Sequence, residues 1–219
     1  MTLIWIHRLV GTSWLIKEAI IIGCGGHAHV VGATLYALNI TIYGYLDSSF
    51  KINKSETIEL GSLIGTPDCL SQLDNQKYDV YVAIGDNHKR HEMIENIAKM
   101  GFAMPFLIHP KSILEDDCKV GEASSVCLGA ILATEVKLGK GVIVNTGCSV
   151  DHETTIGDYT HIAPKVTVAG RVSIGQDVFV GMGACIAQNI VIGDGVTIGA
   201  GAIVLKNVPE NTKVIGIYH

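Results

Sequence analysis

The sequence predicts a two-part protein in which a small Rossmann-like α/β domain precedes a parallel β-helix. Three patterns support this prediction. Aliphatic residues recur at every sixth position over residues 108–204, a glycine-rich turn follows an apolar run at residues 19–22, and later apolar runs alternate with segments that fit helices. We therefore expect an N-terminal extension at residues 1–17, the α/β domain at residues 18–107 and the β-helix at residues 108–219.

The six-residue repeat is the strongest pattern in the chain. Because Ile, Leu and Val make up about three in ten residues, chance would place them at all these positions with a probability on the order of one in a billion. The positions are Ile108, Leu114, Val120, Val126, Leu132, Leu138, Val144, Val150, Ile156, Ile162, Val168, Ile174, Val180, Ile186, Ile192, Ile198 and Val204. Each hexad should supply a short strand and a turn, so that three hexads form one triangular coil of roughly 18 residues.

Small residues accompany these aliphatic residues at two fixed positions. The next residue is mostly small, as in Gly121 and Gly157, and the residue four positions on is small or β-branched, as in Ala130 and Thr160. We expect the second group to face a narrow core, and glycine or Asp-Gly to relax the backbone at the corners.

The N-terminal part fits alternating strands and helices. The expected strands are residues 19–22, 40–46, 80–84 and 102–108, the expected helices are 29–38, 68–73 and 88–100, and residues 48–62 look polar and irregular. The ligand crevice of such a sheet lies at the carboxyl ends of the strands, where Gly25, Asp47 and Gly85 would converge.

The turn at residues 23–28, GCGGHA, suits a phosphate, because glycines allow close backbone approach and the next helix presents N–H groups. It is not a full G-x-G-x-x-G pattern, and a tight turn without a ligand is the alternative interpretation. Asp47 ends the second expected strand, where dinucleotide-binding folds hold a ribose hydroxyl. This acidic residue favours a nucleotide site.

Composition narrows the class of protein. The formal charge is −5, aromatic residues make up 6% and no Lys/Arg run occurs, so nucleic acid is not an expected partner. The six cysteines form no C-x-x-C pair, and Cys118 and Cys148 take the small inward position of their hexads. We interpret the cysteines as reduced residues of a cytoplasmic protein.

Residues 1–17 are apolar but do not fit a targeting segment. They lack the charge order and cleavage site of a signal peptide, and they are too short and too interrupted to span a bilayer, so we expect no membrane partner. These residues either result from translation at an upstream start codon or form a short segment that packs on a neighbour.

His152 interrupts the hexads at a turn position, directly before Glu153. Imidazole titrates near neutrality and an adjacent carboxylate can fix its tautomer, so this pair suits a general base. A turn histidine that is merely exposed to solvent is the alternative.

Four motifs together resemble the NeuD/PglD-type sugar acyltransferases, over about residues 18–216. They are GCGGHA, YLD and AIGDNHKR after the first three strands, and VDHETTIGDYTHIA in the hexads. The resemblance implies a bacterial enzyme that acetylates a nucleotide-linked amino sugar, or sialic acid, for surface glycan synthesis. It also implies a left-handed β-helix, whereas the general preference for right-handed crossovers would suggest the opposite hand.

The resemblance implies roles for individual residues. His152 would be the catalytic base and Glu153 its partner, in a direct transfer from acetyl-CoA. The residues expected at acetyl-CoA are Asn145, His161, Gly170, Met182 and Ala200. The residues expected at the nucleotide sugar are Gly25, Gly26, His27, Asp47, Ser48, Gly85 and His88. The coenzyme slot would lie between the subunits of a homotrimer, and the usual G-x-P-A-K tail of the family is replaced by Gly216-Ile217-Tyr218-His219.

A metal site is an alternative use of histidines on a β-helix, because γ-class carbonic anhydrases bind zinc through three of them. The hexads carry His109, His152 and His161, but His109 lies more than two coils from the other two. We therefore expect no metal.

Three functions follow as hypotheses. We favour N-acetylation of a nucleotide-linked amino sugar. O-acetylation of sialic acid uses the same fold with another acceptor, and non-catalytic nucleotide-sugar binding is the hypothesis from a different class.

Overall fold

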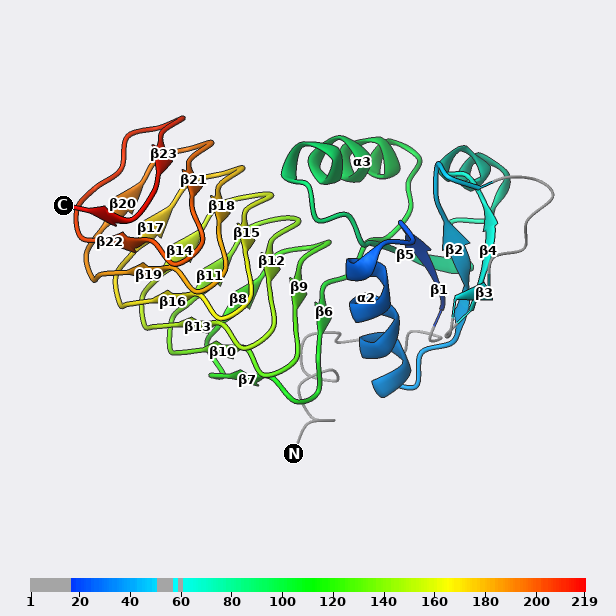
Figure 1. Cartoon of the computed structure of the whole chain (residues 1–219). Coiled ribbons are helices and arrows are strands. Elements are labelled where there is room, and N and C mark those ends of the chain that lie inside the picture. Colours follow the sequence, from blue (N-terminus) through cyan, green and yellow to red (C-terminus); the bar gives the residue numbers. More distant parts are fainter. Residues whose placement is uncertain (1–16, 51–56, 59–60) are drawn as a thin grey trace.

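The chain forms an α/β body and a β-helix that lie side by side (Figure 1). This computed structural model describes residues 17–50, 57–58 and 61–219. Residues 1–16 of the predicted extension, and part of the stretch predicted to be irregular, lie outside the described residues.

The sheet of the α/β body has the strand order β3-β4-β2-β1-β5. Its strands are β1 (Glu18–Ile22), β2 (Ile42–Leu46), β3 (Thr57–Ile58), β4 (Gly61–Gly65) and β5 (Tyr78–Val82). Neighbouring strands are parallel except for the short β3–β4 pair. The predicted parallel strands β1, β2 and β5 are confirmed. The sequence prediction missed β4, which has glycine at both ends and therefore a weak strand propensity.

Three helices join these strands: α2 (Gly26–Ala37), the 3-10 helix η1 (Pro67–Gln72) and α3 (Asn87–Lys99). All three were predicted, but α2 begins three residues earlier than expected, inside the glycine motif. It lies between the sheet and the first strand of the β-helix (Figure 1). No helix in the described part of the chain is long and apolar enough to cross a membrane.

The prediction of one continuous strand at residues 102–108 is wrong. Ala103 forms an isolated bridge with Asp79, whereas β6 (Leu107–Ile108) pairs with strand β9 of the β-helix. Pro105 lies between the two segments and has no N–H group to donate to a strand ladder.

The β-helix is built from two-residue strands. They are β6 (Leu107–Ile108), β7 (Ile113–Leu114), β8 (Lys119–Val120), β9 (Ser125–Val126), β10 (Ile131–Leu132), β11 (Lys137–Leu138), β12 (Ile143–Val144), β13 (Ser149–Val150), β14 (Thr155–Ile156), β15 (His161–Ile162), β16 (Thr167–Val168), β17 (Ser173–Ile174), β18 (Phe179–Val180), β19 (Cys185–Ile186), β20 (Val191–Ile192), β21 (Thr197–Ile198), β22 (Ile203–Val204), β23 (Lys213–Val214) and β24 (Ile217–Tyr218). The second residue of each strand from β6 to β22 is the predicted aliphatic residue, so the repeat is confirmed throughout.

Strand pairing repeats every 18 residues and creates three parallel sheets, in a left-handed β-helix as predicted. For example, Ile131 pairs with Ser149, and Lys137 with Thr155. We call the sheets the first face (β6, β9, β12, β15, β18, β21, β23), the second face (β7, β10, β13, β16, β19, β22, β24) and the third face (β8, β11, β14, β17, β20). A vertex of the triangular coil separates each pair of faces.

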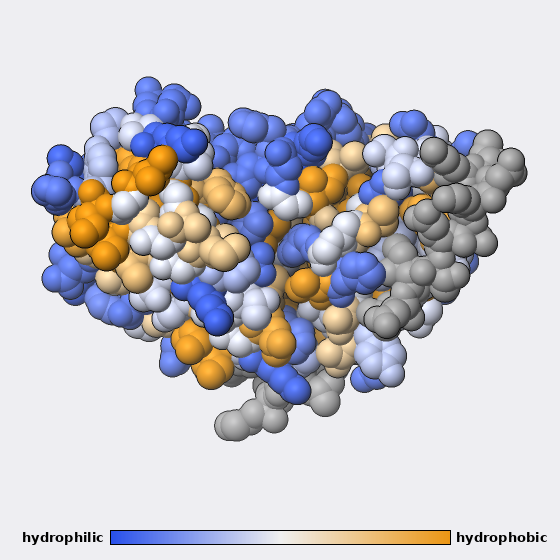
Figure 2. Space-filling view, in the orientation of Figure 1, coloured by the Kyte–Doolittle hydropathy of each residue, from blue (hydrophilic) through white to orange (hydrophobic). Residues whose placement is uncertain are grey.

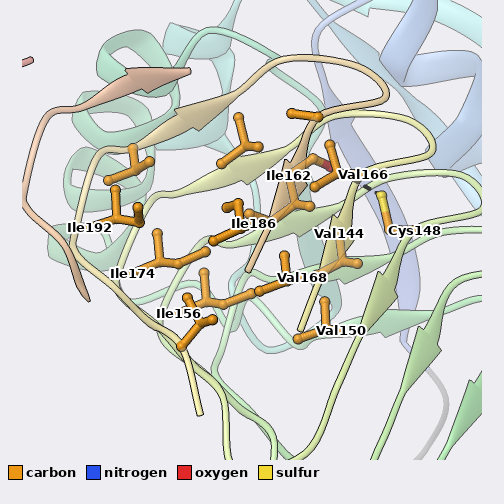
Figure 3. Close-up of a cluster of buried hydrophobic side chains, with 14 of the residues drawn as sticks. Val144, Cys148, Val150, Ile156, Ile162, Val166, Val168, Ile174, Ile186 and Ile192 are labelled. Carbon is orange, nitrogen blue, oxygen red and sulfur yellow. Dashed lines mark hydrogen bonds between the residues drawn. The ribbon is translucent and has the colours of Figure 1, made fainter. Parts of the chain in front are cut away.

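The core of the β-helix is a continuous stack of aliphatic side chains (Figure 3). Val144, Val150 and Ile162 are fully buried, and burying such a side chain stabilises the fold by about 1.5–3 kcal/mol. Cys118 and Cys148 are buried in the predicted inward positions, and burial raises the pKa of the Cys148 thiol to about 11.

Glycine relaxes the backbone at some corners as expected, at Gly141 (φ 63°) and in the Asp-Gly pair that ends at Gly195 (φ 65°), but the glycines directly after the aliphatic residues do not lie at these corners. The left-handed backbone occurs two residues later, at positions such as Glu153 (φ 57°) and Arg171 (φ 58°). Gly157 is required for another reason, because a Cβ there would lie 2.6 Å from the carbonyl carbon of Gly175 in the next coil. Close stacking of the coils therefore selects these glycines.

The buried guanidinium of Arg90 ties α3 to the β-helix. Arg90 is 0% exposed, its Nε donates to the carbonyl oxygen of Gly141 (2.9 Å) and its Nη2 to that of Tyr159 (2.6 Å). Nη1 donates to the carbonyl oxygens of residues 84–85 (3.1 Å each), and Nη2 also to Asn87 Oδ1 (3.0 Å). Burial lowers the pKa of Arg90 to about 10, so it stays cationic at neutral pH.

Helix α3 lies along the vertex between the third and first faces and contacts three successive coils. A Cβ on Gly141 would lie 2.7 Å from Ile94 Cδ1, so the helix packs directly on this glycine. One coil on, Tyr159 stacks on His91 with ring centroids 3.7 Å apart, and another coil on, Asp177 Oδ2 is 3.3 Å from His91 Nδ1. The 18-residue spacing thus forms a seat for α3.

We expect Arg90→Met to lower the free energy of unfolding by about 2–4 kcal/mol, because buried acceptors in both bodies lose their donor. Urea titration followed by circular dichroism would measure the change. Lys89→Met, at the exposed neighbouring position, is the matched control and should stay close to the native midpoint. Equal midpoints for the two variants would contradict the role of Arg90.

Candidate functional site

His152 and Glu153 lie on the turn after β13, at the vertex between the second and third faces. The imidazole Nδ1 is 2.9 Å from Glu153 Oε2, and the backbone N–H of His152 donates to Asp151 Oδ1 (2.7 Å). The His152 side chain is 40% exposed. The ring is therefore oriented by its neighbour and open to a ligand.

The hydrogen bond to Glu153 defines the tautomer of His152. Hydrogen bonds from His152 and then from Arg171 lower the pKa of Glu153, so its carboxylate is ionised at neutral pH. An ionised carboxylate can only accept, hence Nδ1 carries a proton, and in the neutral imidazole Nε2 keeps its lone pair. One oriented nitrogen and one free lone pair make the arrangement of a general base.

Gly170 occupies the same turn position as His152, one coil later, and is buried. A Cβ at this position would lie 2.5 Å from His152 Nε2. We predicted Gly170 as an acetyl-CoA contact, and the structure adds a second reason for glycine here. Without a side chain, residue 170 leaves room for the imidazole.

His161 lies on β15 of the first face. It links the β-helix to the turn that follows β5 of the α/β body. Its Nδ1 is 3.1 Å from the carbonyl oxygen of Gly85, and its Nε2 is 3.2 Å from Asn145 Nδ2. Since a carbonyl only accepts, Nδ1 carries the proton and Nε2 accepts from the amide. Both nitrogens of this histidine are engaged.

His27, at the start of α2, lies beside His161, with ring centroids 6.5 Å apart. Burial first, and then nearby positive charge including that of Arg90, lowers the pKa of both histidines to about 4. Both imidazoles are therefore neutral at pH 7. The Nε2 atom of His27 is buried without a hydrogen-bond partner.

The turns after β1 and β2 meet at Asp47, as predicted. Asp47 Oδ2 accepts from the backbone N–H of Cys24 (3.0 Å) and Oδ1 from that of Ser49 (2.8 Å). Partial burial alone would raise the pKa of Asp47, but the hydrogen bonds from Ser49 and Cys24 lower it. The Asp47 carboxylate thus ties the two turns together.

Gly25, Gly26 and Gly85 border open space at the carboxyl ends of the strands. A Cβ on any of the three would meet nothing within 4 Å, so internal packing does not require glycine there. Ser48 and His88 are exposed at the same end of the sheet. The backbone beside these glycines is accessible to a ligand, as the predicted crevice demands.

Met182 and Ala200 lie at the vertex between the first and second faces, on adjacent coils. The Met182 residue is 62% exposed, and the carbonyl oxygen of Met182 accepts from the N–H of Gly201 (2.8 Å). Asn145 belongs to the same vertex, two coils before Met182. These positions line one edge of the β-helix.

The predicted site residues form two groups, which lie on different sides of the β-helix in a single chain. His27, Gly85, Asn145 and His161 meet on the first face. His152 lies at the vertex between the second and third faces, which is opposite the first face in a triangular coil. A site that needs both groups is therefore incomplete in a single chain.

Two arginines of the site were missed by the sequence prediction. Arg90 donates to the Gly85 carbonyl (3.1 Å), and Arg171 Nε donates to Glu153 Oε2 (2.8 Å). Arg171 follows Glu153 by 18 residues, so counting one coil would have found it. Arg90 precedes Ile94 and Ile97 by four and seven residues, and this helical spacing could have indicated that it is buried.

The described part of the chain contains no group of three or more His, Cys, Asp or Glu residues arranged to hold a metal ion. His109, considered above as a zinc ligand, instead accepts at Nδ1 from the backbone N–H of Lys111 (3.0 Å).

Two family profiles match the chain. The PglD N-terminal domain matches residues 18–97, and the bacterial transferase hexapeptide profile, with six repeats, matches residues 171–206. Comparison with curated protein sequences gives no significant match.

Solved structures of acetyltransferases match nearly the whole chain. The acetyltransferase domain of PglB from Neisseria gonorrhoeae, solved with acetyl coenzyme A, is 33% identical, with 90% of this chain and 95% of that chain covered and a TM-score of 0.84. PerB from Caulobacter crescentus, solved with CoA and GDP-perosamine, is 31% identical, with 91% and 94% covered and a TM-score of 0.83. A histidine-to-alanine mutant of the GDP-perosamine N-acetyltransferase from Caulobacter crescentus, also with CoA and GDP-perosamine, is 30% identical, with 94% and 96% covered and a TM-score of 0.86.

We expect the protein to lose stability as the pH falls from about 6.5 to about 4. In the unfolded chain His161 takes up a proton near its ordinary pKa of 6.5, whereas in the folded chain it does so only at about 4. The free energy of unfolding therefore rises with pH across this window, by at most about 3 kcal/mol for this histidine. Urea titrations at several pH values would measure the slope.

His161→Asn should reduce this pH dependence, because asparagine does not titrate, and His27, whose pKa is also lowered to about 4, should account for the remaining slope. His29→Asn, which alters an exposed histidine of α2, is the control and should keep the native slope. Identical slopes for the two variants would show that His161 does not cause the effect.

Proposed function

Because the chain belongs to the NeuD/PglD-type family of hexapeptide acetyltransferases, we propose that it acetylates the amino group of a nucleotide-linked amino sugar. The protein is an acetyl-CoA-dependent sugar N-acetyltransferase, and acetyl-CoA is its co-substrate. The observation that carries the proposal is the His152–Glu153 pair, whose free Nε2 can accept a proton.

In the proposed reaction the neutral amine attacks the thioester carbonyl of acetyl-CoA directly. The C–N bond forms, the amine proton passes to His152 Nε2, and the C–S bond then breaks. The proton leaves His152 with the departing CoA thiol, so the base is regenerated. A positioned general base contributes about 10²–10⁴-fold to such a step.

We assign the nucleotide to the crevice of the α/β body, at residues 18–107. The open backbone at Gly25, Gly26 and Gly85 and the N-terminus of α2 suit phosphates, and Asp47 ends the second strand, where such folds hold a ribose hydroxyl. His27, Ser48 and His88 border the same space. The buried Nε2 of His27 lacks a partner, and a ligand group would supply one.

We assign acetyl-CoA to the β-helix, at residues 108–219. Asn145, His161, Met182 and Ala200 would line its path on one side, and Gly170 would lie near the reacting end beside His152. These two sets of residues lie on different sides of one β-helix, so one chain does not enclose the coenzyme.

We propose that a homotrimer completes the site, with His152 of one copy close to the nucleotide sugar held by the next. The outward residues of the second face are Ile113, Ile131, Ser149, Thr167, Cys185, Ile203 and Ile217, none of them charged. Ile113 and Ile217 are each 61% exposed, and Figure 2 shows apolar patches on the β-helix surface. Sedimentation should give three times the chain mass; a fully active monomer would contradict the trimer.

The solved relatives support an amino sugar as the acceptor in our proposal. The Caulobacter crescentus enzyme is a GDP-perosamine N-acetyltransferase, which supports an amine rather than the hydroxyl of sialic acid. We therefore place the reaction in bacterial surface glycan synthesis. The buried thiols of Cys118, Cys127 and Cys148 fit a reducing compartment such as the cytoplasm.

A panel of UDP-, GDP- and dTDP-amino sugars tested beside sialic acid would reveal the acceptor, and turnover of sialic acid alone would contradict N-acetylation.

His152→Ala should reduce kcat by at least about 100-fold, because the amine loses its proton acceptor. Release of CoA, followed with a thiol reagent, measures turnover, and calorimetry should show unchanged binding of the nucleotide sugar. His109→Ala removes a histidine of the first coil and should leave turnover at the native level. If His152→Ala kept full activity, another group would have to be the base.

A further inference from the structure

Arg171 contacts the His152–Glu153 turn in two ways. Its Nε donates to Glu153 Oε2 (2.8 Å), and its backbone N–H donates to the carbonyl oxygen of His152 (2.8 Å). Both contacts follow from the register, since Arg171 stands one coil after Glu153 at the same left-handed turn position. Its neighbour Gly170 makes room for the imidazole.

One carboxylate oxygen joins all three side chains. Glu153 Oε2 accepts from Arg171 Nε and is 2.9 Å from His152 Nδ1. The Glu153 side chain is 43% exposed and that of Arg171 is 61% exposed. A lone exposed carboxylate on a turn samples several rotamers, whereas a guanidinium bond leaves fewer of them.

We propose that Arg171 is a positioning residue that holds the Glu153 carboxylate against His152 Nδ1 and thereby keeps the His152 Nε2 lone pair free. This inference rests on the proposed function only for the role of His152 as the base. The geometry of the three side chains stands without it. An exposed ion pair adds little to stability, so the effect of Arg171 should appear in the tautomer and in kcat.

The charged groups around His152 come from three coils. Asp151 and Glu153 are its chain neighbours, Arg171 lies one coil later, and Glu135 occupies the same turn position as Glu153 one coil earlier. Of these, Glu153 is bonded to the imidazole, and Arg171 is the cation that binds that carboxylate.

The first test replaces Arg171 by asparagine, which tolerates the left-handed backbone but is too short to reach Glu153. We expect kcat to fall about tenfold with unchanged KM for acetyl-CoA and for the sugar. Arg171→Lys should recover part of the loss, and Lys165 (φ 59°) shows that lysine is accepted at this turn position. Asn189→Gly, one coil further on, is the matched control and should keep native kcat.

The second test asks whether Arg171 acts through Glu153. Glu153→Ala is compatible with the backbone, because Ala123 occupies the equivalent position with φ 56°. If Arg171 works by placing this carboxylate, Arg171→Asn should cause no further loss of kcat in the Glu153→Ala background. If the losses of kcat in the two single variants multiply in the double variant, or if the KM for acetyl-CoA rises, Arg171 is instead a substrate contact and the proposal is overturned.

The third test does not depend on the acceptor. Nitrogen NMR of labelled histidine should show the Nδ1–H tautomer of His152 in the native protein and a mixture of both tautomers in Arg171→Asn. An unchanged tautomer, or a lowered Tm with native kcat, would leave Arg171 a structural residue and refute the inference. Loss of the proposed function would appear separately, as absent turnover by the native protein across the whole acceptor panel.

Discussion

The 18-residue register of the stacked coils is the constraint on which the rest of the structure depends. Two-residue strands are too short to be stable alone, so each is held by the strands one coil before and one coil after it. Side chains at the same turn position therefore form columns along the vertices. The columns that matter here are Gly141, Tyr159 and Asp177 under α3, His152 with Gly170, and Glu153 with Arg171. The chemistry of the site is thus set by residues that are distant in sequence but adjacent by one coil.

The carbonyl oxygen of Gly85 is the point where the two bodies are locked together. It accepts from Arg90 Nη1 and from His161 Nδ1, which uses both of its lone pairs. Arg90 makes its hydrogen bonds to neutral oxygens of both bodies, so its buried charge is satisfied without an ion pair. The loop that borders the proposed nucleotide crevice cannot shift without breaking these bonds. We infer that this loop is pre-organised by the β-helix on which it rests.

The sequence predicts those parts of this fold that depend on local periodicity. The aliphatic repeat, strands β1, β2 and β5, and the turn that carries His152 and Glu153 are visible because the pattern lies within a few residues. Strand β4 and the break at Pro105 were missed, since pairing in the sheet overrides weak local preferences. The separation of His152 from His161 also follows from the repeat, because nine residues are half of an 18-residue coil. The burial of Arg90 follows from the docking of α3, and its helical spacing from Ile94 and Ile97 indicates the buried face but not the partners.

The two histidines of the VDHETTIGDYTHIA motif are nine residues apart, and their environments decide which can be a base. His161 is buried, its pKa lies at about 4, and both of its nitrogens are bonded, to Gly85 and to Asn145. A proton offered to it would have to displace one of those bonds and place a charge in a buried site beside Arg90. His152 is partly exposed, its Nδ1 is bonded to an ionised carboxylate that can stabilise an imidazolium, and the glycine below it leaves Nε2 clear. Of the two histidines, His152 therefore has the environment that the proposed base requires, while His161 holds the two bodies in place.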